Sequence, residues 1–439
     1  MGTSALTKTF GSASSASDRY KFTFSTWFKR GLYGSGNDYY LFGHQSSDGA
    51  SDFAIRIDSD ALRLYDYQSS SYNIQKVTNR LFRDVNAWYH IVIKIDTTQA
   101  TSTDRVKIYV NGSEETSFST NTDPSQNQSI YAFSNTGQPT VVGGRYTSSL
   151  TAGYYWDGSL AHTHCIIGYA YDASAFGETD ATTGIWKPKT APSVTYGTNG
   201  FFLKFENSGS MGTDSSPNGN NFTVNGTLTQ TVDTPSNVFA TMNPLHSSNT
   251  TFSNGNTKVV GASSGNPIPT STLAVSKGKW YWETKMKGSY FNVGIMRVDQ
   301  NLLTLGIGYG SAGWVYAIDG NIYHNGSQLL QTGTTISVND IVGFYLDLDN
   351  GTLKLQKNGS NVYSGNAVIT SIPLTDFYYI QCNSYDFNNE FNFGNGYFGT
   401  TAVSSANNDV GGQGIFEYSP TLSGVNYYAL NTKNINTYG

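Results

Sequence analysis

The chain has 439 residues, which is enough for two or three domains with substantial cores. Only 13% of the residues are charged, whereas Gly, Ser, Thr, Asn and Tyr are abundant, a usage typical of β-rich, turn-rich extracellular proteins rather than helical cytosolic enzymes. A net charge of −5 without a basic cluster excludes the electrostatic footprint of a nucleic-acid-binding protein or of a binder of anionic membranes.

The first ten residues, MGTSALTKTF, lack the basic and apolar blocks of a secretory signal, and no apolar run approaches membrane-spanning length. Cys165 and Cys382 are too far apart to indicate a disulfide framework or a zinc knuckle. We therefore expect a protein that leaves the cell by lysis, as virion proteins do, or one with a removed leader.

Alternation of apolar and polar residues predicts half-buried antiparallel strands in the first half of the chain. In KFTFSTWF, Phe22, Phe24 and Phe28 share one face, and the segments DFAIRID, HIVIKID and RVKIYV follow the same pattern. Asn111-Gly112 closes RVKIYV with a dipeptide that favours a tight hairpin. The best helix candidate is a single turn over 172–178, with Asp172 as its cap.

A second run of strands begins near residue 279 with KWYWETKMK and continues through DIVGFYLDLDNGTLKLQKNG and FYYIQCN. Between the runs, Asp233-Thr234-Pro235 interrupts the pattern and marks a domain boundary. After residue 400 the chain is polar, then ends in an aromatic stretch with enough apolar side chains to dock. The pattern predicts domains at 1–234 and 235–400 and a docking peptide at 401–439.

Two stretches resemble known families. FTFSTWFKRG, NAWYHIVIKIDTTQATSTDRVKIYVNG and FFLKFEN resemble a concanavalin A-like domain of the laminin-G type over residues 5 to 234. GKWYWETKM, NVGIM, GYGSAGWVYAIDG, DIVGFYLDLDNGTLKLQKNG and FNFGN resemble a SPRY domain over 237 to 400. Both resemblances imply two-sheet sandwiches that bind glycans or proteins, so the expected fold is all-β, with two tandem antiparallel β-sandwich (jelly-roll) domains.

The stretch GSLAHTHCIIGYAYDASAFGETDATTGIWKPK is similar to the end of the laminin-G-like domain in bacteriophage virion proteins, notably of marine phages. Together with the join DTPSNVFATMNPL and the tail ALNTKNI, it implies a phage fibre or surface protein.

The stretch SLAHTHCIIGY sets two histidines and a cysteine within four positions, as a soft metal site does. Strand alternation, however, puts Leu160, His162 and His164 on one face and Cys165 on the other. The remaining two histidines lack the third protein ligand of a catalytic zinc site, which favours ordinary strand residues.

Glycan hydrolysis needs two carboxylates facing each other across about 5 Å in a retaining enzyme. The nearest candidates are Glu178 with Asp180, in a turn-like segment, and Asp347 with Asp349, before a hairpin turn. Neither pair has the required context, so binding is favoured over hydrolysis. No nucleophile elbow or phosphate-binding loop is present in the sequence.

Calcium is the one metal with suitable oxygen ligands in loops, at Asp52 and Asp157, although each aspartate also suits a turn or a solvated position. No cofactor is otherwise required. Carbohydrate recognition uses aromatic faces, and two Gly-rich loops supply them. The candidate ligand-binding residues are Tyr33, Tyr39, Tyr40, Tyr154, Tyr155 and Trp156, each of which also suits packing against its own sheet.

These observations favour a non-enzymatic phage virion protein, a tail fibre, head fibre or decoration protein, that presents loops to host-surface polysaccharide or protein. Other virion proteins are expected partners. The chain is also expected to form a homo-oligomer, and a trimer would suit a fibre. Nucleic acid and membrane insertion are not expected. A purely structural decoration protein and a glycan depolymerase remain the alternatives.

Overall fold

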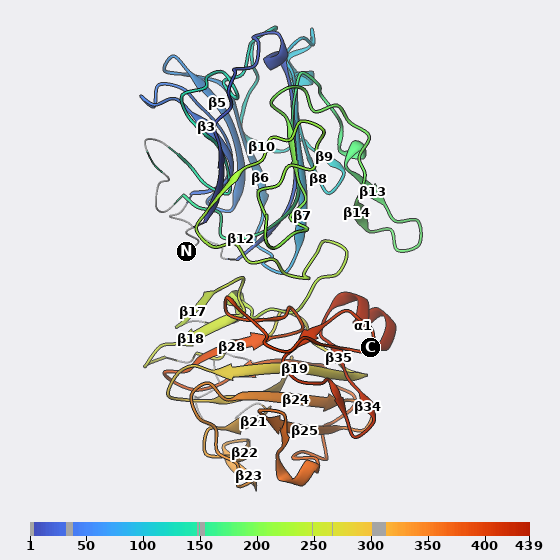
Figure 1. Cartoon of the computed structure of the whole chain (residues 1–439). Helices are drawn as coiled ribbons and strands as arrows, with labels where there is room; N and C mark the ends of the chain where they lie inside the picture. The colour runs from blue at the N-terminus through green and yellow to red at the C-terminus, as the bar shows by residue number, and fades with distance from the viewer. Residues whose placement is uncertain are drawn as a thin grey trace. The chain divides into compact units, whose positions relative to one another are not determined.

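The computed structural model describes residues 4–31, 38–146, 149, 154–247, 249–265, 267–300 and 313–439. The chain divides into two compact units, Met1–Gln230 and Thr231–Gly439 (Figure 1). Both units are built from antiparallel sheets, so the predicted all-β class with two sandwich domains is confirmed.

The first unit pairs an eight-stranded sheet with a six-stranded sheet. In spatial order the larger sheet contains β10 (Phe118–Thr122), β6 (Ser71–Leu81), β5 (Ala61–Gln68), β4 (Asp52–Asp58), β3 (Asp38–Gln45), β11 (Thr140–Val142), β1 (Ala5–Lys8) and β16 (Thr223–Asn225). The smaller sheet contains β15 (Phe201–Leu203), β12 (Gly158–Ile167), β2 (Lys21–Arg30), β7 (Trp88–Asp96), β8 (Val106–Val110) and β9 (Ser113–Glu115). A separate hairpin is formed by β13 (Gly177–Thr179) and β14 (Trp186–Pro188).

The core of the first unit lies between these sheets. The predicted alternation is confirmed there, because Phe22, Phe24 and Phe28 of β2 and Phe53 and Ile55 of β4 all belong to one buried cluster. At the predicted hairpin between β8 and β9, Asn111 and Gly112 have positive φ angles of 49° and 83°. A two-residue turn of this kind requires a left-handed backbone at both positions, and Asn and Gly are the residues that adopt it most readily.

The second unit has a similar two-sheet plan. One sheet runs in the order β17 (Thr250–Ser253), β18 (Lys258–Gly261), β28 (Asn388–Asn392), β19 (Lys279–Met286), β24 (Ile341–Asp347), β25 (Thr352–Lys357) and β26 (Ser360–Asn361), with β35 (Tyr428–Ala429) parallel to β19. The other runs β23 (Ser327–Gln331), β22 (Asn321–His324), β21 (Gly313–Ala317), β20 (Asn292–Arg297) and β27 (Tyr378–Cys382). Short ladders join β29 (Tyr397–Phe398) with β30 (Thr401–Ala402), β31 (Asn407–Asn408) with β32 (Ile415–Phe416), and β33 (Thr421–Leu422) with β34 (Val425–Asn426).

Strand β19 is buried on both faces, which simple alternation does not predict. Trp280 and Trp282 are fully buried, but so are Tyr281 and Glu283 on the opposite face. The C-terminal segment explains why the second face is also buried. The ring of Phe416 packs edge-on against that of Tyr281, with 4.7 Å between the ring centroids, and β35 pairs with β19.

Helical structure is sparse among the described residues. One α-helix, α1 (Thr432–Tyr438), was not expected from the sequence, and Asn431 caps it by accepting from the backbone N–H of Asn434. The turn expected over 172–178 is a 3₁₀ helix at Ala173–Ala175. Asp172 stands at its N-cap position, but the carboxylate binds Lys94 and Tyr109 instead of the helix. Further 3₁₀ turns occupy Asp18–Tyr20, Ser102–Asp104, Pro244–His246 and Tyr363–Gly365. None of the helices in the described ranges is both long and apolar enough to cross a bilayer.

Candidate functional site

The histidines of β12 are structural. The pairing of β12 with β2 shifts between Ala161 and His164, and His162 has a φ of 48°, which marks a bulge. As a result Leu160 packs against the main core, whereas His164 stacks on Phe202 at 3.7 Å in a separate cluster. The expectation that Leu160 shares a face with both histidines was wrong, because the bulge adds one residue and reverses the alternation.

Cys165 is buried in the main core, away from the face of His164. His164 Nδ1 lies 2.9 Å from the hydroxyl of Tyr196, and burial holds the pKa of His164 well below its usual value. No group of three or more His, Cys, Asp or Glu residues suited to a metal occurs within the part of the chain that the structure describes.

A buried serine and histidine on the same sheet are arranged for structure, not nucleophilic attack. Trp186 Nε1 donates to His90 Nδ1 at 3.0 Å, and His90 Nε2 lies 2.9 Å from Ser25 Oγ. An indole N–H can only donate, so His90 Nδ1 must be the acceptor and Nε2 carries the proton. Nε2 therefore donates to Ser25 and cannot act as its general base.

The carboxylates weighed for hydrolysis are held in turns. Asp180 accepts from the backbone N–H groups of Thr182 and Thr183, and its ion pair with Lys187 measures 3.0 Å. Asp347 accepts from the backbone N–H groups of Asp349 and Asn350 at the β24–β25 turn. These contacts are those of turn-forming aspartates.

The most distinctive surface of the first unit is the outer face of β3 to β6, which points away from the main core. We call it the tyrosine–arginine face, and it consists of Tyr40, Arg56, Arg63, Tyr65, Tyr67, Tyr72, Arg145 and Tyr154. Strand alternation produces it, because Phe53, Ile55 and Ile57 of β4 point into the core and Arg56 points outward.

Guanidinium groups and phenol rings alternate across this face. The Arg145 guanidinium lies 5.1 Å from the Tyr154 ring and 5.8 Å from the Tyr40 ring. Arg56 lies between Tyr40 at 5.4 Å and Tyr65 at 5.5 Å. Arg63 and Tyr72 continue the ladder at 5.9 Å. Cation–π contacts of this kind hold each ring in a fixed orientation.

A hydrogen-bonded chain underlies the ladder. Tyr65 donates its hydroxyl to Asp52 Oδ2 at 2.7 Å, and the hydroxyls of Tyr40 and Tyr65 are 3.1 Å apart. Arg56 donates to the Tyr40 hydroxyl at 3.0 Å. Burial raises the pKa of Asp52 above its usual value, and burial likewise raises that of Tyr65. The inner part of the face is therefore rigid and largely dry, while Tyr72 at its outer side remains 40% exposed.

The structure brings together two of the aromatic residues predicted to bind a ligand. Tyr40 and Tyr154 meet edge-on at 5.7 Å in the tyrosine–arginine face. Tyr39 and Trp156 instead belong to the buried core, because Tyr39 has the opposite strand parity to Tyr40 and Trp156 packs on Phe28 at 5.3 Å. Tyr155 is partly buried, and Tyr33 lies outside the described residues.

The surroundings of Asp52 do not suit calcium. Its carboxylate accepts from the phenol of Tyr65 and lies 3.8 Å from the guanidinium of Arg145, so its neighbours are donors rather than further oxygen ligands. The carboxyl of Asp157 is partly buried, and burial raises its pKa. Calcium at Asp157 stays a prediction.

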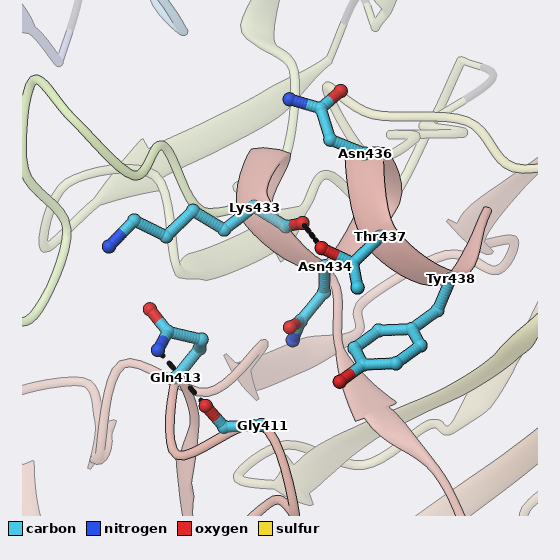
Figure 2. Close-up of a pocket in the computed structure, with 7 residues that line it drawn as sticks. All are labelled: Gly411, Gln413, Lys433, Asn434, Asn436, Thr437 and Tyr438. Carbon is cyan, nitrogen blue, oxygen red and sulfur yellow. Dashed lines mark hydrogen bonds between the residues drawn. The ribbon is translucent and has the colours of Figure 1, made fainter.

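A pocket of about 300 Å³ lies beside α1 in the second unit, where Figure 2 shows Gln413, Lys433, Asn434 and Tyr438 around it. Most of these groups serve the C-terminal segment itself. The Asn434 amide donates to Asp409 at 2.8 Å, and the Tyr438 ring stacks on Tyr428 at 3.7 Å. The residues that line the pocket therefore hold α1 in place. The tyrosine–arginine face is the stronger candidate for a ligand site.

Comparison with known proteins assigns both units. Residues 5–165 match the family model of the concanavalin A-like lectin/glucanases superfamily, and residues 279–395 match that of the SPRY domain. The chain carries a concanavalin A-like domain followed by a SPRY domain.

Individual relatives cover parts of this chain. The ATP-dependent RNA helicase DDX1 of Xenopus laevis is 32% identical over 127 residues, which is 28% of this chain and 16% of the helicase. The crystal structure of the SPRY domain of human HERC1 matches at 19% identity and a TM-score of 0.30, covering 34% of this chain and 96% of that one. The TRIM65 PSpry domain matches at 17% identity and a TM-score of 0.29, covering 35% and 91%.

Sequence reasoning missed most of the tyrosine–arginine face of the concanavalin A-like domain. Arg56, Tyr65 and Arg145 lie in strands or just after one, whereas the sequence prediction considered aromatic residues of loops. A usable signal was present, because DFAIRID and ALRLYDYQ both place an arginine or a tyrosine at positions of outward parity.

Proposed function

We propose that the chain is a non-enzymatic binding protein whose concanavalin A-like domain binds glycan on the tyrosine–arginine face. The observation that carries this proposal is the ladder in which Arg145, Tyr40, Arg56 and Tyr65 alternate over an ordered hydroxyl–carboxylate chain. Sugar rings stack on aromatic faces, and their hydroxyls pair with guanidinium and carboxylate groups at the edges.

Preorganisation supports binding over a merely structural role for the outer residues. The contact between Arg56 and Tyr65 orders the inner aromatic rings of the face before any ligand binds. Binding would therefore carry no further entropic cost for ordering these rings. Tyr72 and Tyr154 retain exposure at the margin, where a sugar ring could reach them. The charges of Arg56 and Arg63 are balanced by two carboxylates, those of Asp38 and Asp58, which favours a polyhydroxyl ligand over a strong anion.

The proposed setting is the surface of a bacteriophage particle, where the chain would be a tail fibre, head fibre or decoration protein that contacts the host. The phage-like features of GSLAHTHCIIGYAYDASAFGETDATTGIWKPK support this setting. Many copies on one particle would multiply a weak single site into useful avidity.

The test incubates the purified full chain with host-surface polysaccharides, with and without a chelator, and follows both retention and new reducing ends. We expect retention without new reducing ends, unchanged by the chelator. The variants Tyr72→Ala and Arg145→Ala should weaken retention, whereas Tyr169→Ala, an exposed tyrosine outside the face, should leave it unchanged.

Other outcomes would change the assignment. New reducing ends would establish a depolymerase and overturn the non-enzymatic proposal. Retention that disappears with the chelator would make calcium part of the site. Absence of retention, combined with fragile particles when the protein is deleted, would establish structural decoration.

A further inference from the structure

A lysine occupies a core-facing position in β6. Burial alternates along this strand, with Ile74, Lys76 and Thr78 buried on one face. Lys76 is only 3% exposed, a level that lysine seldom reaches without a specific partner. An apolar residue would complete the pattern more simply, so the lysine calls for an explanation.

The amine of Lys76 contacts one carboxamide and one carboxylate. Strand β10 lies next to β6 at the edge of the larger sheet (Figure 1), and Asn121 is the direct cross-strand partner of Lys76. Lys76 Nζ donates to Asn121 Oδ1 and lies 2.8 Å from Asp123 Oδ1, whose side chain is 14% exposed. The ring of Phe118 covers the amine, with its centroid 5.1 Å from Nζ.

This grouping places a nucleophile, an electrophile and a proton acceptor together. A hydrogen bond to Oδ1 holds Nζ beside Cγ of Asn121, since the carbonyl bond is only about 1.2 Å long. Reacting atoms held about 3 to 3.5 Å apart in a fixed geometry gain a large entropic advantage over free reactants. Asp123 is in contact with the same nitrogen and so can take its proton.

We propose that Lys76 and Asn121 are joined by an intramolecular isopeptide bond formed with Asp123 as the proton carrier. The Lys76 ammonium gives a proton to the Asp123 carboxylate, and the neutral Nζ attacks Cγ of Asn121. As the Nζ–Cγ bond forms, Asp123 returns its proton to Nδ2, the Cγ–Nδ2 bond breaks and ammonia leaves. The amide nitrogen loses its remaining extra proton to the departing ammonia, which becomes ammonium, so no oxidant or other reactant is needed.

The bond would fasten the outermost strand of the larger sheet. Strand β10 has β6 as its only neighbour in the described sheet, so a covalent link at the Lys76–Asn121 pair would prevent it from peeling away. This inference is independent of glycan binding, because Lys76 belongs to the core-facing side of β6 and not to the tyrosine–arginine face.

The experiment is the intact mass of the purified full chain under denaturing conditions, followed by proteolysis and peptide sequencing by mass spectrometry. We expect a mass lower than that of the sequence by one ammonia, and a branched peptide that joins Lys76 to Asn121. A wild-type chain of full mass, with the two peptides separate after prolonged incubation at neutral pH, would overturn the proposal. So would an ammonia loss that maps to an Asn-Gly succinimide instead.

Two comparisons sharpen the assignment. Asp123→Asn should restore the full mass, and an Asp123→Asn chain that is still cross-linked would refute the role of Asp123. Lys287 donates to Asn339 at 2.7 Å on the surface of the second unit, with no carboxylate in ion-pair range within the described ranges. The Lys287 and Asn339 peptides should stay separate, and a cross-link there would show that mere contact suffices. Because the wild-type mass decides the main question, a variant that fails to fold does not obscure it.

Discussion

The outer sheet faces of the two units carry similar residues but differ in what lies over them. In the concanavalin A-like domain, Tyr40 and Tyr65 join Asp52 in a hydrogen-bonded chain whose margin includes the exposed Tyr72. In the SPRY domain, Tyr281 and Glu283 form an equally polar aromatic face that the chain's own C-terminal segment covers. Aromatic residues at outward strand positions thus serve either an internal docking surface or a candidate ligand surface, and the exposure of the marginal residue Tyr72 distinguishes the two.

The largest effect is expected where the covered face is fastened. Glu283 accepts four hydrogen bonds, from the Tyr281 hydroxyl, the Asn392 amide and the backbone N–H groups of Glu417 and Tyr418. Glu283→Ala leaves these buried donors unpaired, so we expect the free energy of unfolding to fall by about 3–5 kcal/mol. Urea denaturation measures it, with Glu206→Ala, a carboxylate that is 69% exposed, as the control. A loss no larger than the control's would show that Glu283 does not hold the segment.

The two domains should also differ in their response to pH. Burial raises the pKa of Glu283 from 4.5 to about 7 and that of Asp66, in the first unit, from 3.8 to about 6. Because each folded pKa lies above its unfolded value, each contribution to stability is full below the unfolded pKa and is lost as pH rises through the folded one.

Each group should therefore remove about 3 kcal/mol of stability over its own pH window, since one pKa unit corresponds to about 1.4 kcal/mol. The window for Glu283 ends near pH 7 and that for Asp66 near pH 6. Denaturation of the wild type, Glu283→Gln and Asp66→Asn from pH 4 to 8 separates the two. Parallel profiles for all three proteins would contradict this assignment.

A smaller effect is expected in the hydrogen-bonded chain of the tyrosine–arginine face. Tyr65→Phe removes the hydroxyl group that donates a hydrogen bond to Asp52, so the free energy of unfolding should fall by about 1–2 kcal/mol. Tyr67→Phe is the matched control, because its hydroxyl makes no hydrogen bond within the described part of the chain. Equal stability of the two variants would mean that these hydrogen bonds do not order the tyrosine–arginine face.

The smallest effect is expected at the margin. Tyr72→Ala should leave folding intact and weaken glycan binding by roughly threefold to tenfold, which corresponds to about 0.5–1.5 kcal/mol for one aromatic stacking contact. Titration calorimetry with a retained oligosaccharide measures the change, and unchanged affinity would remove Tyr72 from the site.

The sequence predicted the sheets well because their period-two signal is local. Phe22, Phe24 and Phe28 of β2 revealed the core, and Asn111-Gly112 revealed a turn. Non-local effects escaped it. The bulge at His162 reversed the parity of Leu160, and the docking of Phe416 buried Tyr281. Neither can be derived from alternation, because each depends on a partner distant in sequence.

The candidate site was predicted only in part for the same reason. Tyr40 and Tyr154 were selected as loop aromatics, yet their shared environment depends on Arg145 and on the outward residues of β4 and β5. Those residues come together only once the register of β3, β4 and β5 is known.

The most direct test of the central claim is a crystal structure of the full chain with a retained oligosaccharide at saturating concentration. The account predicts a sugar ring stacked against Tyr72 or Tyr154, with hydroxyls within hydrogen-bonding distance of Arg145. A sugar bound to the SPRY domain, or elsewhere on the concanavalin A-like domain, would contradict it.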